Sequence, residues 1–583
     1  MAPERNERRR QNQVACHMCR ARKLKCDQRK PCSSCTSRRW MRVRWKTGCR
    51  LLPDVPQYHQ PKNTKRILLP PRDFALRVID LYEEKLESAQ QVMHIPTVRA
   101  KVQLLYEQSR GPRPGSQQGL IALLLAMSAH IGFWDTYQRN GLFQDVELAA
   151  KVSTVLAQQA MDAMNYARDS TTATMEAVQA ATLLVFLEYH MEGFSMRLRL
   201  LQSTALAMAR ELRLHMIDAV QSKPIDLDQA AVIEIETGRK LWWYIACTDW
   251  LLAFDSGPTQ GVYSVIPQQM RVKKPRNLNT DDFFTRDLDF ERSNDAATPM
   301  AYYFLRIRLA EVCREAVDSM IMQQPEAVPY DKVYELDGKF CALTTSLPRF
   351  LQLDVGPETI KREFGDRGGS QIGLQRALAN LMISVRRCKF HLPFLIRHKI
   401  NPRYAFSRYA CLESAQKLLE VRRVFLDDSS WQISSTLPLL GLYRFVFYAA
   451  MVLVMDLCIN NPNDRTRLVE VRDAMQIVAE TKSTNQTAWH FLHALRDVLS
   501  RHGISLPVEN NSNVITPHQT RQEGTQSIPN DSISECRPMT GRSTDPVFDF
   551  SEFELLWPQN LVDDLFLDPH CWDGLINLDT RIM

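Results

Sequence analysis

Six cysteines lie within the first fifty residues, and they constrain this chain more than any other feature. They are Cys16, Cys19, Cys26, Cys32, Cys35 and Cys49. Two of the spacings are CxxC, and each such pair is followed by a further cysteine. Zinc binds cysteine sulfurs in tetrahedral geometry at about 2.3 Å, and CxxC pairs are typical of such sites. Because a segment of this kind has almost no hydrophobic core, metal binding would supply its folding free energy. The spacing predicts a small metal-folded module.

The charge around these cysteines is strongly positive. Residues 1–50 contain 16 Lys and Arg against 3 Asp and Glu, a net charge of +13. The whole chain carries +7, so the remaining residues sum to −6. The positive charge is therefore local, and a basic block beside a metal fold indicates a surface for phosphate groups. The alternative is a solvated basic tail or localisation signal at Arg8–Arg10, which would leave the spaced cysteines unexplained.

The composition of the rest is that of an ordinary globular chain. Among the 583 residues, 45% are hydrophobic and 24% charged, enough for a sizeable core. The N-terminus is polar and basic, which does not resemble a signal peptide. We therefore expect the other eight cysteines to be reduced thiols, mostly buried, in a cytosolic or nuclear protein. They are Cys247, Cys313, Cys341, Cys388, Cys411, Cys458, Cys536 and Cys571.

Two apolar stretches have the composition of membrane spans. Residues 120–134 contain His130, and residues 437–459 contain Arg444 and Asp456. A spanning helix needs about 20 apolar residues. We expect both stretches to be buried core helices and no membrane partner.

Changes in composition and in hydrophobic periodicity divide the chain into five parts. Residues 1–53 are the metal module, and residues 54–72, rich in proline, are a linker. Residues 73–505 show helical periodicity with short Gly/Pro breaks and hardly any strand pattern. Clear examples are 179–192, 196–214, 236–253, 371–387 and 405–424. Residues 506–544 have the low hydrophobicity of a disordered linker. The predicted fold class is mostly α.

The last part, residues 545–583, alternates acidic and hydrophobic side chains. Nine Asp and Glu stand against one basic residue, Arg581, and aromatic residues such as Phe550, Trp557 and Trp572 lie between them. This composition is typical of disordered activation segments that bind a partner groove. The alternative is a C-terminal helix that docks on the protein's own core.

The cysteine pattern resembles the binuclear zinc cluster of fungal transcription factors. The resemblance covers residues 16–39 and includes Arg22-Lys23-Leu24-Lys25-Cys26 and Pro31. In that family six thiolates hold two zinc ions. Carried over, Cys16 and Cys32 would bridge the ions, Cys19 and Cys26 would complete one site, and Cys35 and Cys49 the other. Two bridging sulfurs turn six ligands into eight coordination bonds, as two tetrahedral ions require.

The same resemblance implies how the module binds double-stranded DNA. The family places a short helix, beginning at the second cysteine, with its end in the major groove, and typically reads CGG triplets. Arg22 and Lys23 would then face base edges, where Arg or Lys donates to guanine O6 and N7. The other basic side chains would contact phosphates, which set register and salt dependence. These are Arg20, Lys25, Arg29 and Lys30.

The chain departs from the family in the gap before the sixth cysteine. Thirteen residues separate Cys35 from Cys49, more than the family usually has. Removing residues 40–46 would leave six. These seven residues are interpreted as a loop insertion or a mis-joined coding segment, and either leaves Cys49 in question as a ligand.

The helical part resembles the fungal-specific regulatory domain that follows many such zinc clusters. Three stretches carry the resemblance: Met93–Thr97, Glu236–Asp249 with Trp242-Trp243, and Val272–Asp282. The two tryptophans are expected to be core anchors whose N–H groups need partners. The alternative is a ligand-sensing or dimerising interior. Arg239 and Asp249 are expected to pair with neighbouring helices.

Together these features predict a nuclear, sequence-specific DNA-binding transcription factor of RNA polymerase II genes. It would activate a metabolic or biosynthetic gene set, through coactivators that bind the C-terminal segment. A homodimer and a small-molecule effector are further expected partners. The alternatives are a repressor, a thiolate-based metal or redox sensor, and a helical enzyme whose zinc is only structural. No HExxH, GxSxG or phosphate loop is present, so the chain is predicted not to be an enzyme.

Overall fold

The computed structural model describes fifteen stretches of the chain. They are residues 50–51, 67–107, 117–136, 142–143, 145–170, 173–193, 195–219, 228–255, 257–284, 290–321, 325–364, 372–399, 401–426, 442–481 and 486–506. The expected metal module, apart from residues 50–51, and the expected segments at 507–583 lie outside these residues. The predicted boundaries at residues 53, 72, 505 and 544 therefore stay predictions.

The chain forms two compact units, Met1–Ala75 and Leu76–Met583. The described part of the first unit contains two short antiparallel strands, β1 (Arg50–Leu51) and β2 (Leu68–Leu69). Arg50 pairs with Leu69 and Leu51 with Leu68. The division between the units falls inside helix α3 (Arg72–Lys85).

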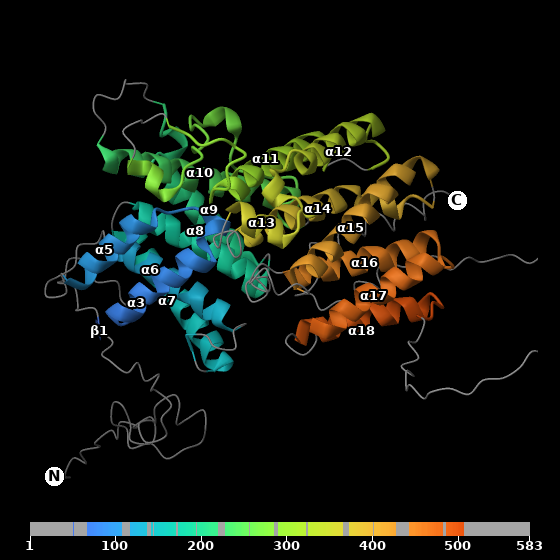
Figure 1. Ribbon diagram of the computed structural model, residues 1–583, viewed down its shortest axis with the longest axis horizontal. Coiled ribbons are helices and arrows are strands. Elements are labelled where there is room, and N and C mark those ends of the chain that lie inside the picture. Colours follow the sequence, from blue (N-terminus) through green and yellow to red (C-terminus); the bar gives the residue numbers. More distant parts are fainter. Residues whose placement is uncertain are drawn as a thin grey trace, which may run out of the picture. The chain divides into compact units, whose positions relative to one another are not determined.

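The second unit consists of helices and connecting loops in its described part, which confirms the predicted mostly α fold (Figure 1). After α3 the α-helices are α4 (Glu87–Gln90), α5 (Ile95–Glu107), α6 (Gln117–Asp135), α7 (Val146–Ser170), α8 (Met175–Glu192), α9 (Met196–Glu211), α10 (Gln229–Phe254), α11 (Ala301–Ala316), α12 (Tyr330–Thr345), α13 (Pro357–Phe364), α14 (Gly373–Ile396), α15 (Ala405–Leu426), α16 (Leu442–Asn460), α17 (Arg465–Thr481) and α18 (Gln486–Arg501). Short 3₁₀ turns are η1 (Leu214–Met216), η2 (Pro267–Gln269), η3 (Thr280–Phe284), η5 (Arg349–Leu351) and η7 (Pro402–Tyr404), and η4 (Val317–Ile321) is a π-helical turn.

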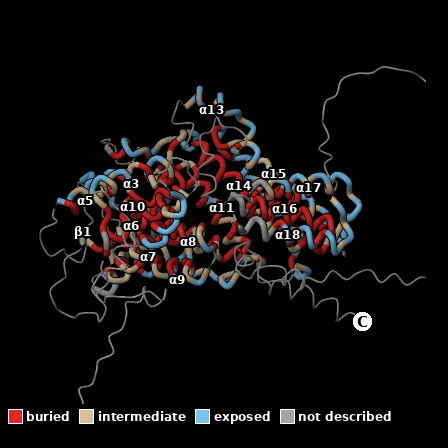
Figure 2. The backbone as a smooth tube through the Cα atoms, turned by 90° about the horizontal axis from the view of Figure 1, so that it is seen from below, coloured by how far each residue is buried: buried red, intermediate tan, exposed pale blue. Residues whose placement is uncertain are grey.

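Helices that follow one another in sequence pack against each other through most of this unit. Helix α6 contacts both α7 and α8, and α8 contacts α9. Further along, α14 packs on α15, α15 on α16, α16 on α17 and α17 on α18, a series that Figure 1 shows in yellow to orange. Figure 2 shows the buried residues concentrated in the interior between these helices.

Several helix starts follow from the sequence. Thr174, Ser195 and Asp228 each occupy an N-cap position and accept a hydrogen bond from a backbone N–H three residues later. Such caps satisfy donors that a helix leaves unpaired at its start. The structure thus supports the helices expected over 179–192, 196–214 and 236–253, with small changes in their bounds.

Helix α14 continues past the predicted end at residue 387. It runs to Ile396 although Pro393 lies within it. Proline removes one helical hydrogen bond, but Phe390, Phe394 and Leu395 are all buried in the core. The tertiary packing of this last stretch outweighs the local effect of the proline.

The described parts of the two apolar stretches, α6 and α16, are core helices, as predicted. Among the described residues, α6 is long and apolar enough to cross a membrane, but 89% of its most apolar window is buried inside the protein. A helix that is hydrophobic all round is typical of a protein core. In α16, Asp456 is fully buried and its carboxylate accepts hydrogen bonds from Arg408 at 2.6 and 2.9 Å. That ion pair explains how a charge is accommodated in an apolar helix.

Candidate functional site

The zinc ligands and DNA contacts expected from the sequence lie outside the described residues. This holds for Cys16, Cys19, Cys26, Cys32, Cys35 and Cys49, for Arg22 and Lys23, and for Arg20, Lys25, Arg29 and Lys30. Their roles stay predictions. In the part of the chain that is described, no group of three or more His, Cys, Asp or Glu side chains could hold a metal ion.

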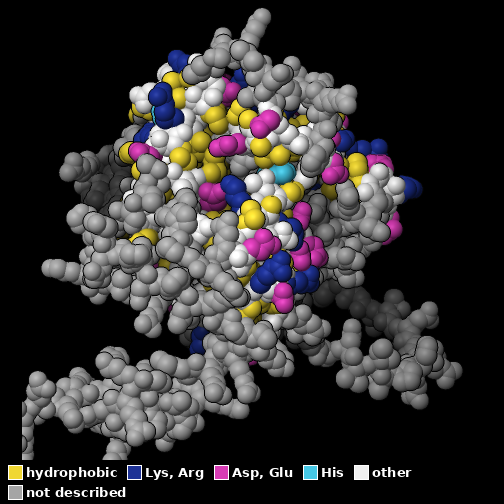
Figure 3. Space-filling model, turned by 90° about the vertical axis from the view of Figure 1, so that its left-hand side faces the viewer, with side chains coloured by type: hydrophobic (Ala, Val, Ile, Leu, Met, Phe, Trp, Pro, Cys, Tyr) yellow, Lys and Arg dark blue, Asp and Glu magenta, His cyan; other side chains and the backbone are white. Residues whose placement is uncertain are grey.

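The surface drawn in Figure 3 differs in charge from the basic first fifty residues. On that face of the helical unit, basic and acidic side chains lie among one another with hydrophobic ones between them. Ion pairs on the neighbouring helices α3, α5 and α8 have the same character, such as Arg99–Asp80 at 2.7 Å and Lys101–Glu176 at 2.6 Å. In these pairs each basic side chain is offset by an acidic one, unlike the basic excess of residues 1–50.

The Glu236–Asp249 stretch lies within α10 and holds two loops against this helix. Glu236 is almost completely buried and accepts hydrogen bonds from Arg239, at 2.5 Å, and from Arg276, at 2.9 Å. Arg239 also pairs with Asp218, which follows η1. Asp249 accepts hydrogen bonds from the backbone N–H groups of Ser264 and Val265, at 2.7 Å each.

The partners expected for Arg239 and Asp249 were therefore partly wrong. Among the described residues, neither side chain forms a hydrogen bond or ion pair with a neighbouring helix; both bind loops, and Arg239 also binds Glu236 one turn away on α10. Arg239 and Asp218 are 21 residues apart in the sequence and lie on different elements. The residue spacing within one helix therefore could not predict their contact.

The tryptophans of this stretch are core residues. Trp243 donates its indole N–H to the carbonyl of Lys273 at 2.9 Å, and Trp250 donates to that of Val265 at 2.8 Å. Trp242 is 1% exposed, and its buried indole nitrogen has no hydrogen-bond partner among the described residues. Core packing, rather than the alternative of a ligand-sensing or dimerising interior, accounts for these side chains.

A cavity of about 120 Å³ lies among helices α4, α8, α9, α10, α11, α14 and α16. Aromatic side chains form much of its lining: Phe186, Tyr189, Tyr244, Tyr302 and Phe445. Two guanidinium groups, those of Arg306 and Arg386, line it as well, together with the carboxylate of Asp255. All three charged residues are buried, with 7%, 6% and 2% exposure.

The two arginines of the cavity have different partners. Arg306 donates to the carbonyl of Tyr244 at 3.1 Å and to the Thr248 hydroxyl at 2.6 Å, and it lies 4.0 Å from the centre of the Tyr244 ring. Arg386 donates to Asp255 at 3.3 Å, and Asp255 also accepts from Lys389 at 2.7 Å. Burial lowers the pKa of Lys389 to about 7, although Asp255 acts to raise it.

Sequence reasoning missed this cavity. One feature of the sequence could have indicated it. Arg306 is a charged residue between the apolar residues Leu305 and Ile307 of α11. The pattern could not show that Asp255, Arg306 and Arg386 meet, because 51 and 80 residues separate Arg306 from the other two.

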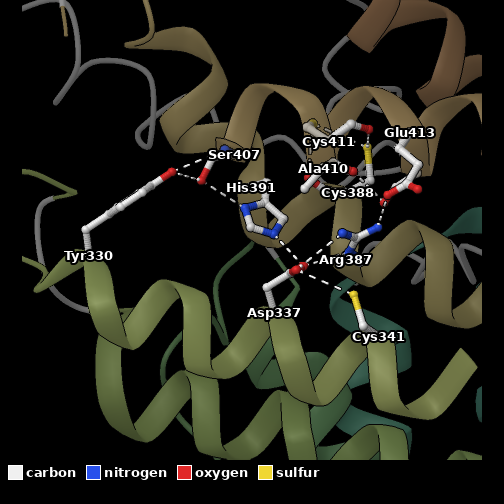
Figure 4. A network of polar contacts seen from close by, with 11 residues as sticks. Tyr330, Asp337, Cys341, Arg387, Cys388, His391, Ser407, Ala410, Cys411 and Glu413 are labelled. Atoms are coloured by element: carbon white, nitrogen blue, oxygen red, sulfur yellow. Dashed lines mark hydrogen bonds and ion pairs between the residues drawn. The ribbon is translucent and has the colours of Figure 1, made fainter. Parts of the chain in front are cut away.

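A buried network joins α12, α14 and α15 through residues of the types found in serine hydrolases (Figure 4). His391 Nδ1 lies 3.0 Å from Ser407 Oγ, and His391 Nε2 lies 2.8 Å from Asp337 Oδ1. Burial alone would raise the pKa of Asp337, but hydrogen bonds from His391 and Arg387 hold it well below its usual range. Both His391 and Ser407 are 0% exposed, so a substrate has no access to the serine. The network connects three helices and is not an active site.

The cysteines of the described part are free thiols, as predicted. Five of the six are buried and Cys341 is half-buried, while Cys536 and Cys571 lie outside the described residues. The sulfurs of Cys388 and Cys411 lie 3.5 Å apart. Burial, followed by the hydrogen bond with Cys388, raises the pKa of Cys411 well above its usual value. A reactive cysteine needs a lowered pKa and exposure, so this thiol is not poised as a sensor.

Comparisons with known proteins identify two domains in the chain. Residues 14–44 match the fungal Zn(2)-Cys(6) binuclear cluster domain, and residues 79–306 match the fungal specific transcription factor domain. The first match includes the five cysteines from Cys16 to Cys35 and ends before Cys49. The second includes α10 and the loops bound to it.

Relatives agree with these matches over most of the chain. The chain is 32% identical to the probable transcription factor lepB of Aspergillus flavus over 556 residues, 89% of this chain and 94% of that protein. It is 28% identical to the agnestins biosynthesis cluster transcription factor AgnL11 of Paecilomyces divaricatus, over 74% of this chain and 62% of the relative. Transcription factor TAS2 of Pyricularia oryzae is also 28% identical, over 62% of this chain and 47% of its own length.

The domains and relatives define a DNA-binding regulator of transcription and not an enzyme. The chain belongs to the fungal Zn(2)-Cys(6) transcription factors, and its N-terminal domain is a zinc-binding one. The family resemblance drawn from the cysteine spacing is confirmed.

Proposed function

We propose that this protein is a nuclear activator of a biosynthetic gene set transcribed by RNA polymerase II. The observation that carries the proposal is the binuclear cluster domain at residues 14–44, embedded in a segment of net charge +13. One relative, AgnL11, is named for a biosynthesis cluster, which favours a gene set of that kind.

The donor set fits two zinc ions. In this proposal Cys16, Cys19, Cys26 and Cys32 bind one ion, and Cys32, Cys35, Cys49 and Cys16 bind the other. All six donors are thiolates, which zinc prefers in structural sites. Bound zinc would organise the short basic segment between Cys19 and Cys26, and the protein side chains would perform the recognition of DNA.

Cys49 is the least supported ligand because of the long gap before it. A transcript read across codons 40–46 tests whether the additional residues belong to the protein. If the residues are real, Cys49→Ser should reduce the zinc content from two ions per chain. An unchanged zinc content in that variant would remove Cys49 from the ligand set.

In DNA recognition, Arg22 and Lys23 would read the bases of a CGG-like site. Arg20, Lys25, Arg29 and Lys30 would bind phosphates. A bidentate contact to guanine contributes about 1–3 kcal/mol to discrimination, whereas a phosphate contact weakens binding to every sequence alike. The two sets therefore differ in what their loss does to specificity.

The experiment compares binding of the full chain to a CGG-containing duplex and to a scrambled duplex at one salt concentration. We expect Lys23→Ala to reduce the preference for CGG by about 1–3 kcal/mol. The matched control is Lys62→Ala in the expected linker, which removes the same charge and should leave the preference intact. Equal discrimination by Lys23→Ala and the unsubstituted protein would refute the assignment.

Activation is proposed to come from residues 545–583. Fused to an unrelated DNA-binding domain, this segment should activate a reporter gene through coactivators. A silent fusion would favour internal docking, and reduced reporter expression would favour a repressor. A homodimer and a small-molecule effector complete the proposed partners. A thiolate-based sensor would instead release zinc at low oxidant concentration and lose DNA binding.

A further inference from the structure

We propose that the cavity lined by Arg306 and Arg386 binds a small organic carboxylate with an aromatic or similarly compact apolar body. The carboxylate would bind the two guanidinium groups, and the apolar body would contact the aromatic walls. The inference rests on the proposed function, since it gives the small-molecule effector of a transcription factor a chemical class and a site.

The first support is an excess of buried positive charge. Among the described residues that line the cavity, the guanidinium groups of Arg306 and Arg386 face one carboxylate, that of Asp255. Asp255 is shared between Arg386 and Lys389. Arg306 has no ion pair among the described residues, because both of its hydrogen-bond acceptors, the Tyr244 carbonyl and the Thr248 hydroxyl, are neutral.

An uncompensated buried charge is costly, and a guanidinium cannot lose its proton to avoid that cost. The ring of Tyr244 offsets part of it through a cation–π contact. Arg386 retains an unused donor as well, since its buried Nε has no hydrogen-bond partner in the described part of the chain. An anion in the cavity would offset the charge of Arg306 and accept a hydrogen bond from Arg386 Nε.

The positive charges of Arg306 and Arg386 both influence one side chain of the cavity, Tyr302. Burial raises the pKa of Tyr302 to about 12, while the charges of Arg306 and Arg386 both act to lower it. Tyr302 itself lines the cavity. Its surroundings therefore contain both guanidinium groups, which come from α11 and α14.

The size and lining of the cavity define the rest of the ligand. An engineered apolar cavity of about 150 Å³ holds benzene, so about 120 Å³ suits a body close to one ring. Aromatic walls favour a flat or compact apolar group over a hydrated anion. Inorganic phosphate has the charge but not the apolar body, and it should not be a good ligand.

The test measures binding of benzoate to the full chain by isothermal titration calorimetry. Benzamide serves as the neutral analogue and inorganic phosphate as the anion without an apolar body. We expect saturable binding of benzoate and at least about tenfold weaker binding of benzamide, since a hydrogen bond to a charged group is lost. Equal binding of benzamide, or displacement of benzoate by an equal concentration of phosphate, would overturn the proposal.

Substitutions then locate the site. Arg306→Met should weaken benzoate binding by about tenfold or more. Arg376→Met is the matched control, because it removes another buried guanidinium, on α14, that does not line the cavity. Unchanged benzoate affinity in Arg306→Met, or the same loss in Arg376→Met, would overturn the proposal.

A second variant keeps the test decisive if Arg306→Met does not fold. Ala89 lines the cavity from α4, so Ala89→Leu would fill part of it and leave the arginines in place. We expect this variant to lose benzoate binding while its circular dichroism stays helical. Benzoate binding at full affinity in folded Ala89→Leu would refute the cavity as the site.

Binding to a CGG duplex is measured on the same preparations. A chain that binds the duplex but not benzoate overturns the cavity inference alone. A chain that binds benzoate with the expected variant pattern but does not discriminate between duplexes overturns the proposed DNA recognition and supports the cavity as a binding site.

Discussion

Glu236 provides the sharpest test of how the regulatory domain is held together. It is 1% exposed, and its carboxylate accepts hydrogen bonds from the Arg239 and Arg276 side chains and from the Arg276 backbone N–H at 3.1 Å. These contacts attach the loop that contains Arg276 to α10. Glu236→Ala would remove the shared acceptor from two arginines that are themselves largely buried, with 13% and 17% side-chain exposure.

The magnitude follows from what remains after the substitution. Removing one partner of a buried ion pair costs about 3–5 kcal/mol. Arg239 keeps Asp218, and Arg276 can reach some water, so we expect a loss near the lower limit, about 3 kcal/mol. Glu236→Gln keeps the shape and one acceptor oxygen, so we expect a loss of about 1–2 kcal/mol.

Urea-induced unfolding followed by tryptophan fluorescence measures this loss, because Trp242 and Trp243 lie on the same helix. The matched control is Glu234→Ala, which removes an exposed carboxylate two residues away. We expect the control to change the free energy of unfolding by less than about 0.5 kcal/mol. Equal effects of Glu236→Ala and Glu234→Ala would refute the reasoning.

Two further predictions concern buried titratable groups. Burial lowers the pKa of His130 to about 4. Between pH 6.5 and 4 the unfolded chain therefore binds a proton that the folded chain does not. As the pH falls through this window, His130 should reduce the free energy of unfolding by about 1.4 kcal/mol per pH unit. In His130→Phe, pH-dependent unfolding should show a shallower slope there, and an unchanged slope would contradict the assignment. Asp456→Asn should cost about 3–5 kcal/mol because Arg408 and Arg467 lose their buried counter-ion, and a urea midpoint equal to that of the unsubstituted chain would exclude this role.

Local sequence patterns were sufficient to predict the helical class and many helix positions. The apolar run at residues 120–134 could be placed in the core because it lacks a polar face, and α6 is buried there. N-cap residues such as Thr174 and Ser195 are local signals, because the cap and the N–H group that it binds are only three residues apart in the sequence. The end of α14 could not be predicted, because the packing of Phe390 and Phe394 overrides Pro393.

The long-range polar contacts could not be predicted for the same physical reason. Asp255 is 131 residues from Arg386, and Asp337 is 54 residues from His391. Each pair depends on how separate helices meet, which no local periodicity encodes. The zinc-binding domain is the opposite case, because the cysteines expected to bind zinc lie within one short segment, and their spacing resembles that of the family.

Zinc dependence of DNA binding tests the central claim most directly. We expect the purified full chain to contain two zinc ions, to bind a CGG duplex more tightly than a scrambled one, to lose that preference when a chelator removes the metal, and to regain it when zinc is restored. A chain without zinc, or one that keeps its preference for the CGG duplex after the metal has been removed, would contradict the claim that sulfur-bound zinc shapes the DNA-binding segment.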